Sequence, residues 1–106
     1  MRLVYGSPFP EGDRERQQWR AQAMGMAFVD LDRIRPDPET VSLIPADLAR
    51  ELRALPVKRD GQTLWVGLDG PGLDSLKKIK DATGLRVIPV LCAPDALDDA
   101  LRQLLS

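Results

Sequence analysis

An arginine-rich stretch near the start of this sequence carries residues suited to ligand binding. They are Arg14, Arg16, Arg20 and Gln22, within a helix predicted from about residue 13 to residue 24. A guanidinium offers a planar fork of N–H donors that matches phosphate oxygens, and its plane can stack on a base. Acidic residues alternate with these arginines between positions 11 and 15. The alternative interpretation is therefore a solvated helix held by local ion pairs.

The count of catalytic residue types excludes several chemistries. The sequence has no histidine and one cysteine, Cys92. Ser-His catalysis, Cys-His catalysis and structural zinc sites are therefore excluded within this chain, and only carboxylates leave an enzyme possible. One cysteine forms no intramolecular disulfide, so we expect a reducing compartment. Cys92 ends an apolar run and is predicted to pack as a small hydrophobe; a reactive thiol would need exposure and a lowered pKa.

Three other segments have both a functional and a structural interpretation. Residues 69–72 (DGPG) precede a predicted helix but lack the ending of a phosphate-binding loop, so they predict a plain turn. One lysine group is either a solvated helix face or a contact for an acidic partner: Lys77, Lys78 and Lys80. One aspartate group either complements a helix dipole or suggests a cation site: Asp95, Asp98 and Asp99. We predict no metal site.

Composition places the chain among globular proteins. Hydrophobic residues make up 43% and charged residues 29%, with a net charge of −1. This balance argues against a dedicated nucleic-acid binder, which carries a basic excess. Because no apolar run approaches the roughly 20 residues of a membrane span, we expect no membrane insertion. No signal peptide is evident, so a cytoplasmic location is expected.

A β-hairpin is the clearest local prediction. Asp60 and Gly61 lie between extended runs at residues 55–59 and 62–68. They predict a two-residue type I′ turn, in which both central residues need positive φ. The second run alternates apolar and other residues, which predicts one core face. Trp65 then lies on the other face, where it either packs beneath the N-terminal helix or anchors a partner protein.

The remaining pattern predicts an α+β fold with a small three-stranded mixed sheet, made of the hairpin and a crossover strand and packed by helices. The crossover strand covers residues 85–92 and should run parallel to the second hairpin strand, because a helix connects them. We expect it beside the first hairpin strand, although the sequence leaves the order open. Pro89 predicts an unpaired edge or a bulge, and residues 27–31 an extended connection.

The predicted organisation divides the chain into two parts. Residues 1–25 form an irregular lead-in and a helical arm, and residues 26–106 form an αβ adaptor domain. The residues predicted to dock the arm on the domain are Trp19, Ala23 and Met26.

An ordered set of short segments resembles the N-terminal domain of type II secretion and type IV pilus assembly ATPases. The segments are residues 26–31 (MAFVDL), 43–45 (LIP), 55–57 (LPV), 60–61 (DG) with 64–71 (LWVGLDGP), and 83–84 (TG) with 87–93 (VIPVLCA). The resemblance covers roughly three quarters of the chain and depends on the order of segments rather than on one motif.

The resemblance implies an adaptor domain without catalysis, because the family's ATP-hydrolysing motifs lie in a separate downstream domain. In secretion ATPases this domain docks on the cytoplasmic part of an inner-membrane platform protein. A protein partner is therefore implied, either such a platform protein or a motor ATPase.

The resemblance also implies an alternative function as a regulatory domain. Some members bind cyclic di-GMP through Arg-Leu-Gly motifs, each followed by a helix that ends in Gln. In this chain the matching residues are Arg2, Arg20 and Gln22. Arg2 and Leu3 are followed by Val4, where the family motif has Gly.

Overall fold

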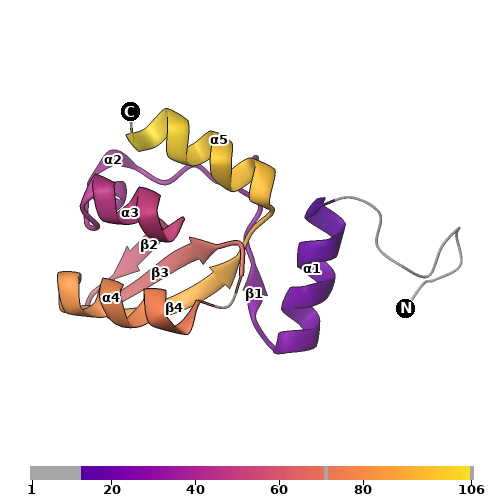
Figure 1. Cartoon of the computed structure of the whole chain (residues 1–106), viewed down its shortest axis with the longest axis horizontal. Helices are drawn as coiled ribbons and strands as arrows, with labels where there is room; N and C mark the ends of the chain where they lie inside the picture. The colour runs from indigo at the N-terminus through magenta and orange to yellow at the C-terminus, as the bar shows by residue number, and fades with distance from the viewer. Residues whose placement is uncertain (1–12, 71, 106) are drawn as a thin grey trace, which may run out of the picture.

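The computed structural model describes residues 13–70 and 72–105, which form five helices and four strands (Figure 1). In chain order the elements are α1 (Asp13–Met24), β1 (Ala27–Phe28), α2 (Pro38–Val41), α3 (Ala46–Leu52), β2 (Leu55–Asp60), β3 (Thr63–Leu68), α4 (Leu73–Thr83), β4 (Arg86–Leu91) and α5 (Pro94–Leu105). None of these described helices has the length and apolar character needed to cross a bilayer.

The sheet is mixed, as predicted, but it has four strands in the order β1-β4-β3-β2. β2 and β3 are antiparallel, and β3 and β4 are parallel, which confirms the crossover. The predicted place of the crossover strand beside the first hairpin strand is wrong. β4 is apolar along both faces and lies in the middle of the sheet, while β2 ends in the polar residues Lys58, Arg59 and Asp60 and lies at an edge.

The fourth strand is β1, which lies within the segment predicted to be an extended connection. Ala27 pairs with Val90 and Phe28 with Leu91, and the Val29 N–H donates to the Leu91 carbonyl at 2.8 Å. Pro89 lies one residue before this short ladder begins, so its missing N–H interrupts no bond to β1. β4 is paired on both sides, so the predicted unpaired edge holds only for residues 86–89, which have no described partner on the β1 side.

The hairpin turn lies one residue later than predicted. Asp60 pairs with Thr63, so the two loop residues are Gly61 and Gln62. Gly61 adopts φ +60° and Gln62 keeps a negative φ, which fits a type II′ turn rather than type I′. The register also shifts between Pro56 and Lys58, where β2 bulges. The type I′ prediction is wrong because Asp60 continues the strand.

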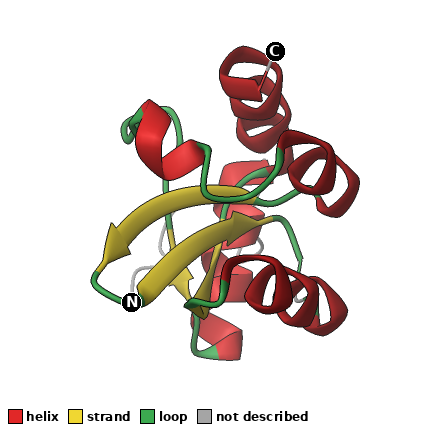
Figure 2. Cartoon of the chain, turned by 90° about the vertical axis from the view of Figure 1, so that its left-hand side faces the viewer, coloured by secondary structure: helices red, strands yellow, loops and turns green. Residues whose placement is uncertain are grey.

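Helices cover both faces of the sheet (Figure 2). The α5-side cluster consists of Val29, Leu31, Val41, Leu55, Val90, Cys92, Leu97, Ala100 and Leu101. The α4-side cluster consists of Ile44, Ala49, Ala54, Leu64, Val66, Leu68, Ile79 and Leu85. Alternation along β3 sends its leucines and valine into the second cluster and Trp65 toward the first, as the period of a strand requires.

Candidate functional site

α1 is attached to the rest of the fold through a buried glutamine. Gln17 is 3% exposed, and its Nε2 donates to the main-chain carbonyls of Asp69 and Cys92, each at 2.9 Å. These carbonyls directly follow β3 and β4, so one amide bridges the carboxyl ends of two parallel strands. Ala21, one turn further along α1, is also buried. The small side chain lets the helix approach closely while the amide satisfies both carbonyls.

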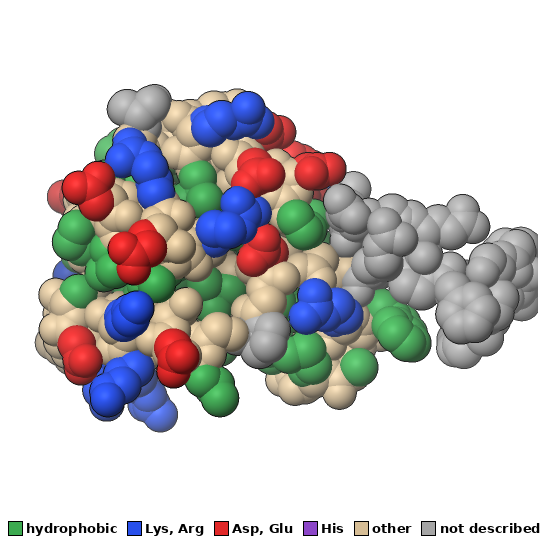
Figure 3. Space-filling model, in the orientation of Figure 1, with side chains coloured by type: hydrophobic (Ala, Val, Ile, Leu, Met, Phe, Trp, Pro, Cys, Tyr) green, Lys and Arg blue, Asp and Glu red, His purple; other side chains and the backbone are tan. Residues whose placement is uncertain are grey.

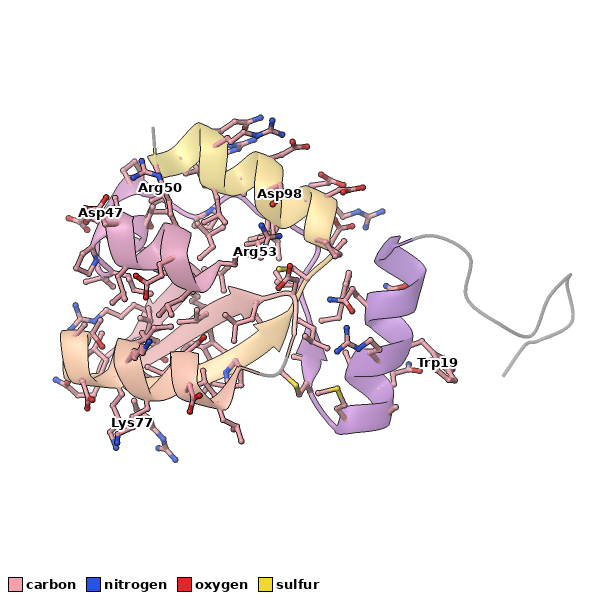
Figure 4. All side chains as sticks on the ribbon, in the orientation of Figure 1. Trp19, Asp47, Arg50, Arg53, Lys77 and Asp98 are labelled. Carbon is pink, nitrogen blue, oxygen red and sulfur yellow. The ribbon has the colours of Figure 1, made fainter. Side chains whose placement is uncertain are left out.

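The predicted docking residues of α1 are largely wrong. Trp19 is 57% exposed and points away from the sheet (Figure 4), and Ala23 is exposed as well. Met26, beyond the helix, is half-buried. Helix geometry explains the error, because Trp19 lies about 200° around the axis from both Gln17 and Ala21. The sequence prediction used the largest apolar residue, whereas the structure uses a polar one.

The ligand residues predicted from the family motif are placed differently from one another. Arg2 lies outside the described residues. Arg20 is exposed, and its Nη1 donates to Gln17 Oε1 at 2.9 Å, which extends the hydrogen-bond network that attaches α1 to the strand ends. Gln22 is exposed and lies about 200° around the helix from Arg20. Ligand binding by these residues stays a prediction.

Trp65 has a packing role in the structure. Its half-buried ring packs against the α5-side cluster, and Lys58 Nζ lies 5.6 Å from the ring centroid. The cover over this face of the sheet is thus α5 and its neighbours, where α1 was one of the predicted options. The ammonium of Lys58 lies over the ring, and the role of the exposed part of Trp65 toward a partner stays a prediction.

Arg53 forms a charged junction that the sequence did not indicate. Its Nε and Nη2 donate to Asp69 Oδ2 at 3.0 and 2.8 Å, and its Nη1 donates to Asp98 Oδ1. The hydrogen bond to Asp98 and the bonds to Asp69 raise the pKa of Arg53, against the effect of burial. Three elements therefore meet at one side chain: the end of α3, the loop after β3, and α5.

The backbone of Arg53 is unusual too. It takes φ 52° and ψ 55°, the left-handed conformation that closes a helix, and is the one such non-glycine residue in the described chain. A glycine at the end of α3 would have indicated this cap in the sequence. Because Arg53 stands there instead, neither the cap nor the junction was predicted. Asp69 links this junction to α1, because its carbonyl accepts from Gln17 while its carboxylate accepts from Arg53.

Cys92 packs as predicted. It is fully buried, its Sγ lies 3.4 Å from the Leu68 carbonyl, and burial raises the pKa of its thiol to about 12. Its own carbonyl is one of the two that Gln17 holds. Cys92 therefore contributes its carbonyl to the attachment of α1 and its side chain to the hydrophobic core.

Charged residues elsewhere are mostly at the surface. Lys77, Lys78 and Lys80 are exposed along α4, and Lys78 lies 3.9 Å from Glu51. Asp98 pairs with Arg53, and Asp99 with Arg102. Within the described residues no group of three or more His, Cys, Asp or Glu side chains is arranged to hold a metal ion. A surface pocket of about 360 Å³ is lined by Arg50, Arg53, Asp98, Leu101 and Arg102.

Comparison with known sequences gives a consistent relationship. A family model described as the MshEN domain matches residues 24–106. The type IV pilus assembly ATPase PilB of Thermus thermophilus is 35% identical over 81 residues, which cover 73% of this chain and 9% of PilB. The chain therefore spans a small part of the relative that it matches.

Solved structures with the same arrangement include a structure of MshE with cdg, that is, cyclic di-GMP. It has a TM-score of 0.78 and 25% identity, and the match covers 88% of this chain and 68% of that one. The N-terminal domain of XpsE has a TM-score of 0.70 and 19% identity, with 85% and 64% covered. The second likeness concerns the fold alone.

Proposed function

We propose that this chain is a docking module of a type II secretion or type IV pilus motor, because it belongs to the MshEN domain family. The observation that carries the proposal is the family match, which runs over residues 24–106 and so includes every strand and the helices α2 to α5. In this role the chain performs no reaction of its own. It supplies a rigid αβ body on the cytoplasmic side that holds a motor to its partner.

The partner we propose is the cytoplasmic part of an inner-membrane platform protein or the motor ATPase itself. Trp65 is the proposed contact, because part of its ring stays exposed at the hairpin beside Lys58. Aromatic side chains anchored in a packed surface are frequent hot spots of protein interfaces. The packing of Trp65 on the α5-side cluster holds the ring in one orientation before a partner arrives.

A pull-down with purified proteins tests this function. The tagged chain is mixed with a platform-protein cytoplasmic domain and, separately, with a motor ATPase domain from the same bacterium. We expect one of them to be retained, and retention to fall with Trp65→Ala. Lys77→Ala serves as the matched control, since Lys77 points into solvent from α4 (Figure 4). If Trp65→Ala lowers the retention of neither protein, Trp65 is not part of the interface. If the unaltered chain retains neither protein, the proposal is contradicted.

Binding of cyclic di-GMP is the second candidate function. It is favoured by one observation, the likeness to MshE, whose structure is with cdg, over 88% of this chain. The proposed residues are Arg2, Arg20 and Gln22, of which Arg20 and Gln22 lie exposed on α1. A phosphate bound by Arg20 would compete with the hydrogen bond from Arg20 to Gln17. Ligand binding would therefore alter the hydrogen bonds that attach α1 to the sheet.

Calorimetry with cyclic di-GMP separates the two functions. Saturable heat that disappears in Arg20→Ala and in Gln22→Ala, and persists in Gln18→Ala, would support the sensor. Gln18 is the control because it is exposed on the same helix. Absence of heat at high micromolar ligand would rule the sensor out and leave the docking module.

A further inference from the structure

Asp69 joins two parts of the molecule through two different groups. Its main-chain carbonyl accepts from Gln17 Nε2 on α1 at 2.9 Å, and its carboxylate accepts from Arg53 at the end of α3. Arg53 donates in turn to Asp98 on α5. Where Figure 4 labels Arg53 and Asp98, Figure 3 shows basic and acidic side chains together at the surface. We call this series the Asp69 relay: Gln17, Asp69, Arg53 and Asp98.

Both ends of the Asp69 relay can be reached from solvent. At the α1 end, the exposed Arg20 donates from Nη1 to Gln17 Oε1 at 2.9 Å. At the other end, the side chains of Arg53 and Asp98 are partly exposed. A molecule that engages either end therefore competes with a hydrogen bond of the relay.

The contact in the middle of the relay is stronger than an ordinary surface ion pair. The half-buried carboxylate of Asp69 receives two N–H donors of Arg53, from Nε at 3.0 Å and from Nη2 at 2.8 Å. Charge-assisted hydrogen bonds are stronger than neutral ones, and partial burial reduces their loss to solvent. Because the carbonyl and the carboxylate belong to the same residue, the position that Arg53 gives the side chain also affects where the carbonyl points.

α1 is the element whose attachment this contact can change. Among its described side chains, those from residue 17 onward, Gln17 and Ala21 are the buried ones. Gly25, with φ +68°, separates α1 from β1, a two-residue strand at the edge of the sheet. An element with few buried apolar contacts opens locally at a lower free energy than the core. α1 therefore has two states that the relay can bias, attached and locally open.

We propose that Arg53 controls the attachment of α1 through Asp69. While Arg53 holds the Asp69 carboxylate, the Asp69 carbonyl is directed at Gln17 and α1 stays attached. When a partner draws Arg53 away, that carbonyl is no longer held in place and α1 opens more often. By linkage, opening of α1 weakens the contact between Arg53 and Asp69 by the same factor. This inference goes beyond the proposed function, because it concerns communication within the chain whichever partner is bound.

Amide hydrogen exchange of the whole ¹⁵N-labelled chain tests the proposal. Arg53→Gly removes the guanidinium, and glycine tolerates the left-handed backbone at this position. We expect the amides of α1 to be accelerated about fivefold more than those of β3 and α4, the lower end of typical coupling. Arg102→Ala is the control, since Arg102 pairs with Asp99 on its own helix and should leave α1 unchanged.

A second variant guards against loss of folding in Arg53→Gly. Asp69→Asn keeps the shape of the side chain and the main-chain carbonyl but removes the charge that Arg53 binds. It should accelerate exchange in α1 in the same direction. The dispersion of the amide spectrum reports whether each variant is folded.

A double-variant cycle decides whether Gln17 carries the effect. Gln17→Ala already cuts the relay, so the addition of Arg53→Gly should accelerate α1 no further. In the Gln18→Ala background, where an exposed neighbour is removed, Arg53→Gly should keep its full effect. In the reverse direction, Gln17→Ala should speed the exchange of the Arg53 Nε–H with water, and Gln18→Ala should not.

Three results would overturn the proposal. They are unchanged exchange in α1 of both Arg53→Gly and Asp69→Asn, equal acceleration in every element, and the same effect of Arg53→Gly with and without Gln17. The pull-down and the calorimetry address binding and do not depend on these outcomes. Failure of the relay is therefore distinguishable from failure of the proposed function.

Discussion

α1 and α5 are both twelve residues long, yet they attach to the sheet by different means. α5 buries a stripe of Leu97, Ala100 and Leu101 in the α5-side cluster. Among the α1 side chains that the structure describes, those from residue 17 onward, the buried ones are Gln17 and Ala21. The apolar stripe gains stability in proportion to its area, whereas the amide gains it by satisfying two carbonyls at the strand ends. The comparison separates a helix attached through buried apolar area from a helix attached through a buried amide and one small side chain.

Removal of the α5 stripe should have the largest effect. Leu97 is fully buried, so Leu97→Ala should lower the free energy of unfolding by about 2–5 kcal/mol. Urea denaturation followed by circular dichroism measures the loss. Leu73→Ala is the control, because Leu73 is 80% exposed and its truncation should change little. A loss for Leu97→Ala no greater than the control's would show that α5 is not part of the cooperative body.

Removal of the α1 amide should have a smaller and local effect. Gln17→Ala leaves the carbonyls of Asp69 and Cys92 without their donor, at a cost of about 1–3 kcal/mol. We expect faster amide hydrogen exchange in α1 while β3, β4 and α5 keep their protection. Gln18→Ala, an exposed neighbour, should change neither. Faster exchange throughout the sheet would contradict the separation of the two parts.

The cap of α3 allows a finer comparison of backbone and side chain. Both Arg53→Ala and Arg53→Gly remove the bonds to Asp69 and Asp98. Only glycine also relieves the left-handed backbone, so the glycine variant should be more stable than the alanine variant by about 1 kcal/mol. Thermal unfolding of the two variants side by side measures this difference. Equal stability would show that α3 ends differently once the arginine is lost.

The reactivity of Cys92 should change least. Because its pKa is raised to about 12 from the usual 9.0, the protonated thiol favours folding below pH 9.0, and this contribution is lost as pH rises toward 12. A thiol reagent at pH 8 should label Cys92 only through unfolding. Gln17→Ala should speed this labelling only in proportion to its loss of global stability, since α5 still covers the residue in the folded chain. Rapid labelling in that variant would assign the protection of Cys92 to α1 instead.

The sequence predicted those parts of the fold that depend on repeated apolar spacing. The α+β class, the mixed sheet, the parallel crossover and α5 follow from periodicity, and each is confirmed. β1 was not predicted as a strand because two residues are too few to show an alternating pattern. The place of β4 in the sheet depended on which hairpin strand is the more polar. The residues of β4 itself do not indicate this.

The candidate sites were predicted less well because they depend on single contacts between distant positions. Gln17 and Cys92 are 75 residues apart, and nothing about a glutamine in a charged helix indicates that it is buried. Arg53 and Asp98 are 45 residues apart, and each has an ordinary local interpretation. Trp65 was the exception, since strand alternation placed it correctly on the second face of the sheet.

The uncharged side chain of Gln17 and the charged side chains of Arg50 and Arg102 should respond differently to salt. A neutral amide on two carbonyls is nearly indifferent to ionic strength and does not titrate. The guanidiniums of Arg50 and Arg102 lie at the surface, where salt weakens every attraction they make. A rise in ionic strength would thus weaken the ion pairs of Arg50 and Arg102, while the hydrogen bonds of Gln17 continue to hold α1 against the strand ends.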